Sequence, residues 1–421
     1  MLSIRGVPME QRVITHAQPL AWLSDGVLAK HAATYQAYLE ERRYAPRTRH
    51  AYLCCVAHLA QWMASAGLSA RQIGEPAINR FLGELLPRCA CPHPVRRLHR
   101  DNRSALRLFL KALGSSLTQC EAADHISREL SRFDLFMGDV KGLATSTRRQ
   151  RLRVIGRFLR DQFGSRPIVG QQIKPADLRR FMFARQQTLS PGALKSIADA
   201  LRGYIQFRAT LGDAVQHLAF AVPTVASRRL CTLPRVLSDA DILRFLRSFD
   251  QSAPSGKRAF AMARCLVDLG LRCQEIARLR LDDIDWHNGT IRLAANKARR
   301  TDVLPLPAET GRAIAAYLRT ERPTTSNRAV FVRHVAPYDE PIGPGAMRNV
   351  IIAAFHRCGW PHCRVHILRH STASRLLAAG TPLKEIADIL RHRSLDTTAI
   401  YTKVDTNRLA AVAMPWPGRA S

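Results

Sequence analysis

The sequence predicts a mainly α-helical protein of several domains with one small β-hairpin in its C-terminal half. Apolar residues recur at helical spacing along most of the chain. Two short extended runs, Thr290–Ala294 and Asp302–Leu306, flank a basic tip, as the strands of a hairpin do. The 421 residues exceed one ordinary domain, and a hydrophobic content of 46% is enough for folded cores.

The charge of the chain predicts its partner. Lys and Arg number 64 against 33 Asp and Glu, which gives a net charge of +31. A surface of this kind binds polyanions, and the predominance of Arg suits phosphate, because the planar guanidinium donates two parallel hydrogen bonds. A GC-rich genome would explain the ratio of Arg to Lys, but it does not explain the excess of positive charge.

The compartment is predicted from cysteine usage and from the absence of apolar runs. The 10 cysteines are scattered, several of them in apolar helical stretches, as is typical of reduced thiols in a cytosol. The sequence shows neither a cleavable N-terminal segment nor a run of 18 apolar residues. We therefore expect a soluble, cytoplasmic protein with no membrane role.

After an N-terminal arm of residues 1–27, two helical stretches resemble each other. Thr48–Leu53 and Thr147–Leu152 both begin with Thr-Arg and place Arg on the polar face, and an Arg-Phe pair recurs at Arg80 and Arg180. These matches lie 99 and 100 residues apart. Chance similarity of amphipathic helices is the alternative, but the constant offset favours duplication of one module, over 28–118 and 128–222.

Each module is expected to end in a helix that a glycine stops. The first closing helix is Ala105–Leu113 with Gly114 after it, and the second is Ala200–Leu211 with Gly212 after it. Residues 223–236 then form a linker, with Pro223 and Pro234 near its ends.

A different domain is predicted over 237–415, followed by a tail at 416–421. Ser238 can cap a helix Asp239–Phe249, and Thr381 with Pro382 is expected as an N-cap and first-turn pair. Besides the hairpin, we expect helices at about 257–269, 273–280, 308–321, 345–357, 367–379, 382–391 and 395–403.

Six residues of this domain predict a phosphate-handling site: Arg272, Lys297, His366, Arg369, His392 and Tyr401. Two arginines can hold phosphoryl oxygens, and Arg272 is expected at the start of a helix, where the dipole adds positive field. The Tyr401 phenol would attack a phosphodiester, which requires a base or positive surroundings because its free pKa is about 10. Taken singly, such an Arg is usually a solvated charge and such a Tyr a core residue.

The other members have roles in proton transfer. His366 and His392 would donate to phosphate or relay the tyrosine proton, and Lys297 would protonate the leaving 5′ oxygen. Each alone is more often structural or solvated. His370 is assigned to packing or to support of the site, and Glu275 either orients Arg272 or closes a local helix pair.

No metal and no other cofactor is expected. Two groups, Cys89-Cys91-His93 and Cys358-His362-Cys363, lack the paired spacing of a zinc site. The chain also has neither a phosphate-binding glycine loop nor an acidic cluster for magnesium.

Together these residues resemble the tyrosine recombinase (phage integrase) family. Its first-arginine box is similar to Leu269–Ile276, its hairpin lysine falls on Lys297, and its His-x-x-Arg-His box falls on His366–His370. Its late histidine and nucleophile fall on His392 and Tyr401. The family often has Gly-His where this chain has Arg391-His392, and we expect no loss of function from this difference.

The resemblance implies a mixed α+β catalytic domain at 237–415, preceded by a helical core-binding domain at 128–222. The module at 28–118 would be an extra copy that extends the DNA footprint. Double-stranded DNA would be clamped between domains, Tyr401 would form a 3′-phosphotyrosyl intermediate in its own or a neighbouring subunit, and four protomers would act on two sites. The expected DNA contacts are Arg49, Arg148, Arg149, Arg299 and Arg300.

Two other functions remain open at this stage. A type IB topoisomerase would use a similar residue set to relax DNA, and a DNA-binding regulator would have lost catalysis. The helical modules argue against the topoisomerase. The complete set of six residues argues against the regulator. The sequence does not distinguish integration, excision, transposition and dimer resolution, and it names no target site.

Overall fold

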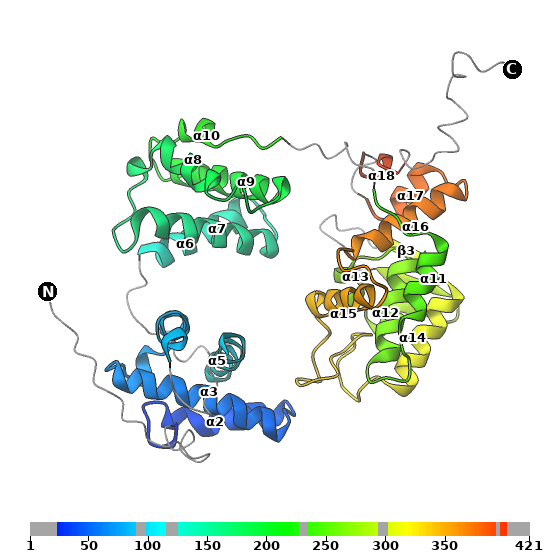
Figure 1. Ribbon diagram of the computed structural model, residues 1–421, viewed down its shortest axis with the longest axis horizontal. Coiled ribbons are helices and arrows are strands. Elements are labelled where there is room, and N and C mark those ends of the chain that lie inside the picture. The colour runs from blue at the N-terminus through cyan, green and yellow to red at the C-terminus, as the bar shows by residue number, and fades with distance from the viewer. Residues whose placement is uncertain are drawn as a thin grey trace. The chain divides into compact units, whose positions relative to one another are not determined.

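The computed structural model describes residues 23–89, 98–114, 125–226, 234–293, 302–392 and 396–401. Within these residues the protein is helical apart from one three-stranded antiparallel sheet, which confirms the predicted fold class (Figure 1). None of the helices in these ranges is both long and apolar enough to cross a bilayer.

The N-terminal helices are held by buried aromatic residues. Tyr35 donates a hydrogen bond of 2.9 Å to the carbonyl of Ala105, and its ring meets Phe109 edge-on at 5.1 Å. Arg49 forms an ion pair of 2.5 Å with Glu40. The elements are α2 (Ala29–Glu41), α3 (Pro46–Ser65), η1 (Ala70–Gln72), α4 (Glu75–Arg80), η2 (Phe81–Leu85), η3 (Leu86–Arg88) and α5 (His99–Leu113).

The second module has its own core, built on aromatic rings. Phe133 packs edge-on against Tyr204 at 5.5 Å and contacts Phe207 at 5.4 Å. Beside these rings, buried Glu129 accepts hydrogen bonds of 2.8 Å from Tyr204 and Arg208. The elements are α6 (His125–Leu135), η5 (Phe136–Val140), α7 (Thr145–Phe163), η6 (Gly170–Gln172), α8 (Pro175–Phe183), α9 (Pro191–Thr210) and α10 (Leu218–Ala221).

The starts of several elements repeat at the offset from which the duplication is predicted, and the duplication itself stays a prediction. The helices α3 and α7 start 99 residues apart, and η1 and η6, like α4 and α8, start 100 residues apart. Both closing helices begin earlier than expected, α5 at His99 and α9 at Pro191, and the glycines after them adopt positive φ. Residues 125–226 and the C-terminal region belong to different compact units, and each is described by itself.

The C-terminal region is organised around α12. This helix packs against α11, α13, α14, α15 and α16, so that Ala261, Met262 and Cys265 are fully buried. The sheet order is β1-β2-β3, with Leu293 paired to Asp302 at the end of β2 and β3 where the chain connects the two strands. The elements are α11 (Asp239–Arg247), α12 (Gly256–Asp268), α13 (Cys273–Arg278), η7 (Leu281–Asp283), β1 (Ile284–Asp285), β2 (Thr290–Leu293), β3 (Asp302–Pro305), α14 (Ala308–Thr320), α15 (Pro344–Arg357), α16 (His366–Ala378), α17 (Leu383–Ile389) and α18 (Asp396–Ala399).

Most predicted boundaries in this region are confirmed to within two residues, with three corrections. Ser238 caps α11, since its hydroxyl accepts from Asp241 N at 3.1 Å. Pro382, expected inside the first turn of α17, is itself the N-cap. The strand β1 was not predicted, because two residues carry no readable alternation. The last helix ends at Ala399, so that Tyr401 lies in a turn. The arm up to residue 22, linker residues 227–233 and the chain after Tyr401 lie outside the described residues.

The buried Arg208 gives a stability prediction for the second module. Replacing Arg208 by Met leaves the carboxylates of Glu129 and Asp213, which are 5% and 14% exposed, without their shared cation. We expect a loss of about 3–5 kcal/mol in the free energy of unfolding of this module. Amide hydrogen exchange in α6 and α9 of the full chain measures it.

The matched control is Arg312→Met, which removes an exposed ion pair with Glu309. That change is expected to cost well under about 1 kcal/mol. Equal losses for the two variants would show that the buried network does not stabilise the module.

Candidate active site

Arg272 is fixed at the start of α13 by Glu275. The backbone N–H of Arg272 donates to Glu275 Oε2, and its Nη1 donates to Glu275 Oε1, both at 2.8 Å. Its Nη2 reaches the carbonyl of Arg391 at 3.4 Å. Glu275 therefore both caps the helix and orients the guanidinium, and the predicted place of Arg272 at a helix start is confirmed.

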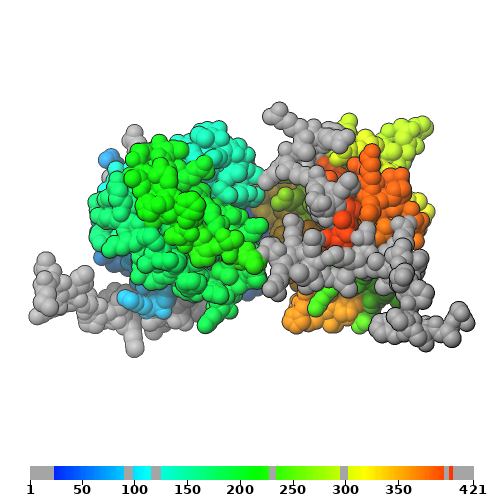
Figure 2. All heavy atoms as spheres, turned by 90° about the horizontal axis from the view of Figure 1, so that it is seen from above, coloured from blue at the N-terminus to red at the C-terminus, as the bar shows by residue number. Residues whose placement is uncertain are grey.

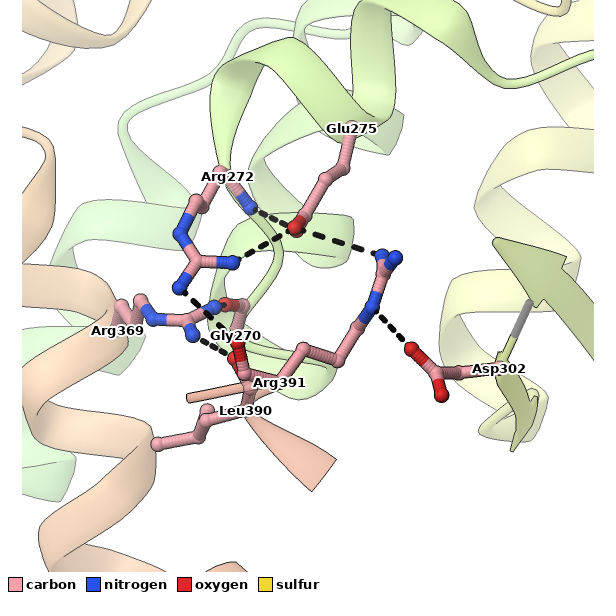
Figure 3. Close-up of polar contacts among 7 residues, drawn as sticks. All are labelled: Gly270, Arg272, Glu275, Asp302, Arg369, Leu390 and Arg391. Atoms are coloured by element: carbon pink, nitrogen blue, oxygen red, sulfur yellow. Dashed lines mark hydrogen bonds and ion pairs between the residues drawn. The ribbon is translucent and has the colours of Figure 1, made fainter. Parts of the chain in front are cut away.

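Arg369 reaches the same place from α16 (Figure 3). Its Nη1 donates to the carbonyl of Gly270 at 2.5 Å, and its Nη2 donates to the carbonyl of Leu390. The residue is only 6% exposed, and burial, followed by the charge of Arg272, lowers its pKa to about 10. It remains charged at neutral pH, so two guanidinium groups converge on one turn.

Gly270 permits this convergence. Its φ of +59° lies in the left-handed region, and a Cβ atom there would lie 2.7 Å from Cδ2 of Leu390. A side chain at position 270 would therefore be strained by this φ and would force the Leu390 side chain to move. This contact explains why a glycine precedes Leu271-Arg272.

Tyr401 is packed beside this turn. Its ring is 1% exposed among Ala373, Leu377, Ile386 and Leu390, and Figure 2 shows the red atoms of residues 396–401 next to the orange atoms of α17. Burial raises the pKa of the phenol, while the charges of Arg369 and Arg272 act in the opposite direction. The phenol therefore lies within the field of both guanidinium groups.

Two histidines contact the phenol. His370 Nδ1 lies 2.8 Å from the Tyr401 hydroxyl, and the His392 ring stacks on the Tyr401 ring at 6.4 Å with 14° between the planes. Nδ1 of His392 is in turn 2.8 Å from the hydroxyl of Thr398. The turn that carries Tyr401 is therefore held by imidazoles from α16 and from the end of α17.

The imidazoles of the site are neutral at pH 7. Burial, then the charges of Arg369 and Arg272, lowers the pKa of His392 to about 4. The same causes, in the same order, lower the pKa of His366, and burial with His366 and Arg369 lowers that of His370. A neutral imidazole has one N–H donor and one acceptor nitrogen, so each ring can donate one hydrogen bond and accept another.

Of the six predicted catalytic residues, five are described, and these five lie together: Arg272, His366, Arg369, His392 and Tyr401. Lys297, like Arg299 and Arg300, lies outside the described residues. Of the two alternatives for His370, support of the site agrees with the structure better than packing, because its Nδ1 is within hydrogen-bond distance of the phenol. A signal existed, because His366 and His370 are four residues apart and therefore on one face of a helix.

The predicted DNA contacts Arg148 and Arg149 differ in their surroundings. Arg148 is bound to Asp134 through two hydrogen bonds of 2.7 and 2.6 Å, and this holds the pKa of the carboxyl low. Arg149 is exposed. Among the described residues no group of His, Cys, Asp or Glu is arranged to hold a metal ion, while Cys91 and His93 lie outside them.

Comparison with known proteins places this site in a family. The family described as "Phage integrase family" matches residues 235–408. The "Putative integrase/recombinase y4rA" of Sinorhizobium fredii is 33% identical over 404 residues, which cover 94% of this chain and 96% of that protein. The chain belongs to the phage integrase family of tyrosine recombinases. It is therefore an enzyme that cuts and rejoins DNA.

Further members of the family agree in sequence and fold. The "Tyrosine recombinase XerD" of Listeria monocytogenes is 29% identical over 59% of this chain and 84% of its own. A structure of XerH site-specific recombinase bound to difH, a post-cleavage complex, has a TM-score of 0.54 at 19% identity, covering 80% of this chain and 94% of that one. The Tn1549 transposon integrase with transposon right end DNA has a TM-score of 0.52 at 17% identity, covering 67% and 99%. These two structures support the recombinase fold.

The lowered histidine pKa values predict how stability depends on pH. An unfolded chain takes up protons at histidines near pH 6.5, whereas the folded chain keeps His392 and His334 neutral down to about pH 4. Stability is therefore complete above about pH 6.5 and falls as the pH drops toward 4. The melting temperature should fall between about pH 7 and 5, where carboxylates with a lowered pKa remain ionised.

His334 provides the control because it lies outside the active site, bonded to Ser255 at 2.8 Å. His334→Gln removes one depressed histidine and should make the pH dependence shallower. A melting temperature that is constant or rises as the pH falls over this range would contradict the prediction.

Proposed function

We propose that this enzyme is a site-specific recombinase that breaks and rejoins duplex DNA through a 3′-phosphotyrosyl bond to Tyr401. One observation supports the proposal most strongly: Arg272 and Arg369 meet at the 390–391 turn, and the Tyr401 phenol lies in the field of both. The guanidinium groups would bind the non-bridging oxygens of the scissile phosphate. The integrases among its relatives favour integration, excision or transposition of a mobile element as its task.

The bonds made and broken balance without a cofactor. The Tyr401 oxygen attacks phosphorus, an oxygen–phosphorus bond forms, and the bond from phosphorus to the 5′ oxygen breaks. The phenol gives up one proton, and the leaving 5′ oxygen receives one. Because one phosphodiester replaces another, a 5′ hydroxyl of a partner strand can reverse the step. Fixed positive charge at the phosphoryl oxygens supplies most of the stabilisation.

The imidazoles supply proton handling and further hydrogen bonds. Nδ1 of His370, 2.8 Å from the phenol, can accept its proton, since this imidazole is neutral at pH 7. His366 and His392 can donate N–H groups to phosphate oxygens. Lys297 remains our predicted proton donor to the 5′ oxygen.

The assembly is a proposal as well. Strand exchange between two duplexes requires a tyrosine for each of four strands, so we propose a tetramer on paired sites. The module at 128–222 is the proposed core-binding domain, and 28–118 a second copy. The S. fredii relative aligns over 94% of this chain, so its match includes most of the 28–118 region. The XerD match covers only 59% of this chain.

Covalent trapping tests the nucleophile. The probe is a pool of duplexes with a randomised central region, nicked at random, so that a fragment can leave after cleavage and prevent religation. The wild-type protein should become linked to a subset of DNA that survives denaturation, and sequencing this subset gives the target site. Tyr401→Phe, which keeps the ring and loses only the hydroxyl, should yield no linked DNA.

Several outcomes would reject this function. Linked DNA from Tyr401→Phe would place the nucleophile elsewhere, and none from the wild type would indicate a DNA-binding protein without catalysis. Relaxation of supercoiled plasmids regardless of sequence, without exchange between the selected sites, would indicate a type IB topoisomerase.

Salt dependence tests the proposed DNA clamp. A chain with a net charge of +31 that contacts many phosphates displaces counterions on binding. Its association constant for the selected site should fall by about 10³-fold or more between about 50 and 200 mM salt. A nearly flat response, measured by fluorescence anisotropy, would contradict a binding mode dominated by phosphate contacts.

A further inference from the structure

Arg391 occupies a turn position that favours glycine. Its φ is +55°, in the left-handed region, which is strained for a residue with a side chain. Yet its side chain is 5% exposed and lies between Glu275 and Asp302 rather than in solvent. A strained backbone and a buried charge at one residue indicate that the side chain has a specific task.

The contacts of Arg391 connect three parts of the site (Figure 3). Its backbone carbonyl accepts from Arg272 Nη2, and its Nη1 lies 3.4 Å from Glu275 Oε1, the atom that also holds Arg272. On its other side, Nε donates to Asp302 Oδ2 at 2.6 Å. The guanidinium therefore lies between the carboxylate that orients Arg272 and the first residue of β3.

Asp302 marks one end of the β2–β3 connection. It pairs with Leu293, the last residue of β2, so these two residues close the hairpin at the point where the connection leaves and returns. In the sequence, Lys297 lies midway between them. A charge that fixes Asp302 against Glu275 thus fixes the base of the segment that carries Lys297 relative to Arg272.

We propose that Arg391 is a positioning residue that joins the two-arginine pocket to the β2–β3 hairpin and so aligns the lysine that protonates the leaving oxygen. The proposal rests on the function proposed above. Arg272 is held by Glu275 and by the backbone carbonyl of Arg391, and neither contact is removed with the Arg391 side chain, so loss of this side chain should impair alignment of the proton donor more than phosphate binding. The expected defect lies in leaving-group protonation.

Sulfur substitution isolates that step. In a duplex with sulfur in place of the 5′ bridging oxygen, the phosphorus–sulfur bond breaks and the electron pair leaves as a thiolate, which needs no proton. A variant that lacks only leaving-group protonation is slow on the oxygen substrate and close to wild type on the sulfur substrate. A generally disturbed site is slow on both.

The experiment measures single-turnover cleavage of both substrates, built on the site recovered by trapping. Arg391→Gly removes the side chain and suits the positive φ, and Asp302→Asn weakens the other side of the contact. Each should slow the oxygen substrate by about tenfold or more and leave the sulfur substrate within about threefold of wild type. Arg391→Lys keeps one charge without the fork and should recover only part of the rate.

Two reference variants complete the design. Lys297→Ala should show the same rescue by sulfur, and the double variant with Arg391→Gly should be no slower than Lys297→Ala alone, because both act on one step. Arg312→Gln, which removes an exposed ion pair elsewhere in the domain, should match wild type on both substrates. Melting temperatures establish that each variant is folded.

The outcomes separate the two proposals. If the wild type cleaves neither substrate, the proposed function fails. Suppose that sulfur rescues Lys297→Ala. If Arg391→Gly is then slow on both substrates, or as fast as wild type on both, the role of Arg391 is overturned and the recombinase function stands. If sulfur does not rescue Lys297→Ala, the lysine is not the proton donor, and the alignment role is overturned with it.

Discussion

The active site depends on two guanidinium groups that bind the backbone of the same turn. Arg272 reaches the carbonyl of Arg391 and Arg369 reaches that of Leu390, while Arg369 also holds Gly270 on the opposite segment. These bonds join the loop before α13, the helix α16 and the end of α17. His392 follows this turn in the chain, and Tyr401 packs against Leu390 within it.

This junction leaves positive charge incompletely neutralised. Burial of Arg369, followed by repulsion from Arg272, lowers the pKa of its guanidinium. Glu275 offsets part of this charge but is shared with Arg391, and backbone carbonyls contribute only dipoles. A phosphate group entering the pocket would supply the missing negative charge, so the folded protein already stabilises the charge that develops in the transition state.

Much of the site was predictable because its residues lie at helix ends with a readable spacing. Arg272 lies two residues after Gly270 and three before Glu275, a spacing that suits both the cap and the ion pair. Arg391 was not predictable in this way, because its partner Asp302 lies 89 residues away in the sequence. The hydrogen bond between His370 and Tyr401 spans 31 residues and depends on how the last turn folds onto α16.

The same limit applies to the fold. Long amphipathic helices such as α7, α12 and α14 were located from periodicity, since their apolar faces repeat over several turns. The closing helix α5 starts earlier than expected because its first turn is polar, and α9 starts earlier because Ser190 caps it and Pro191 opens it, a signal that the prediction did not use. The two-residue strand β1 exists only because β2 pairs with it, which is a tertiary effect that local sequence does not carry.

The most direct test of the two-arginine pocket is a crystal structure of the protein with nicked target DNA and orthovanadate, which mimics a five-coordinate phosphorus. The account predicts vanadium bonded to the Tyr401 oxygen, with equatorial oxygens within hydrogen-bond distance of the guanidinium groups of Arg272 and Arg369. Vanadium bound at another residue, or either guanidinium turned away from it, would contradict the account.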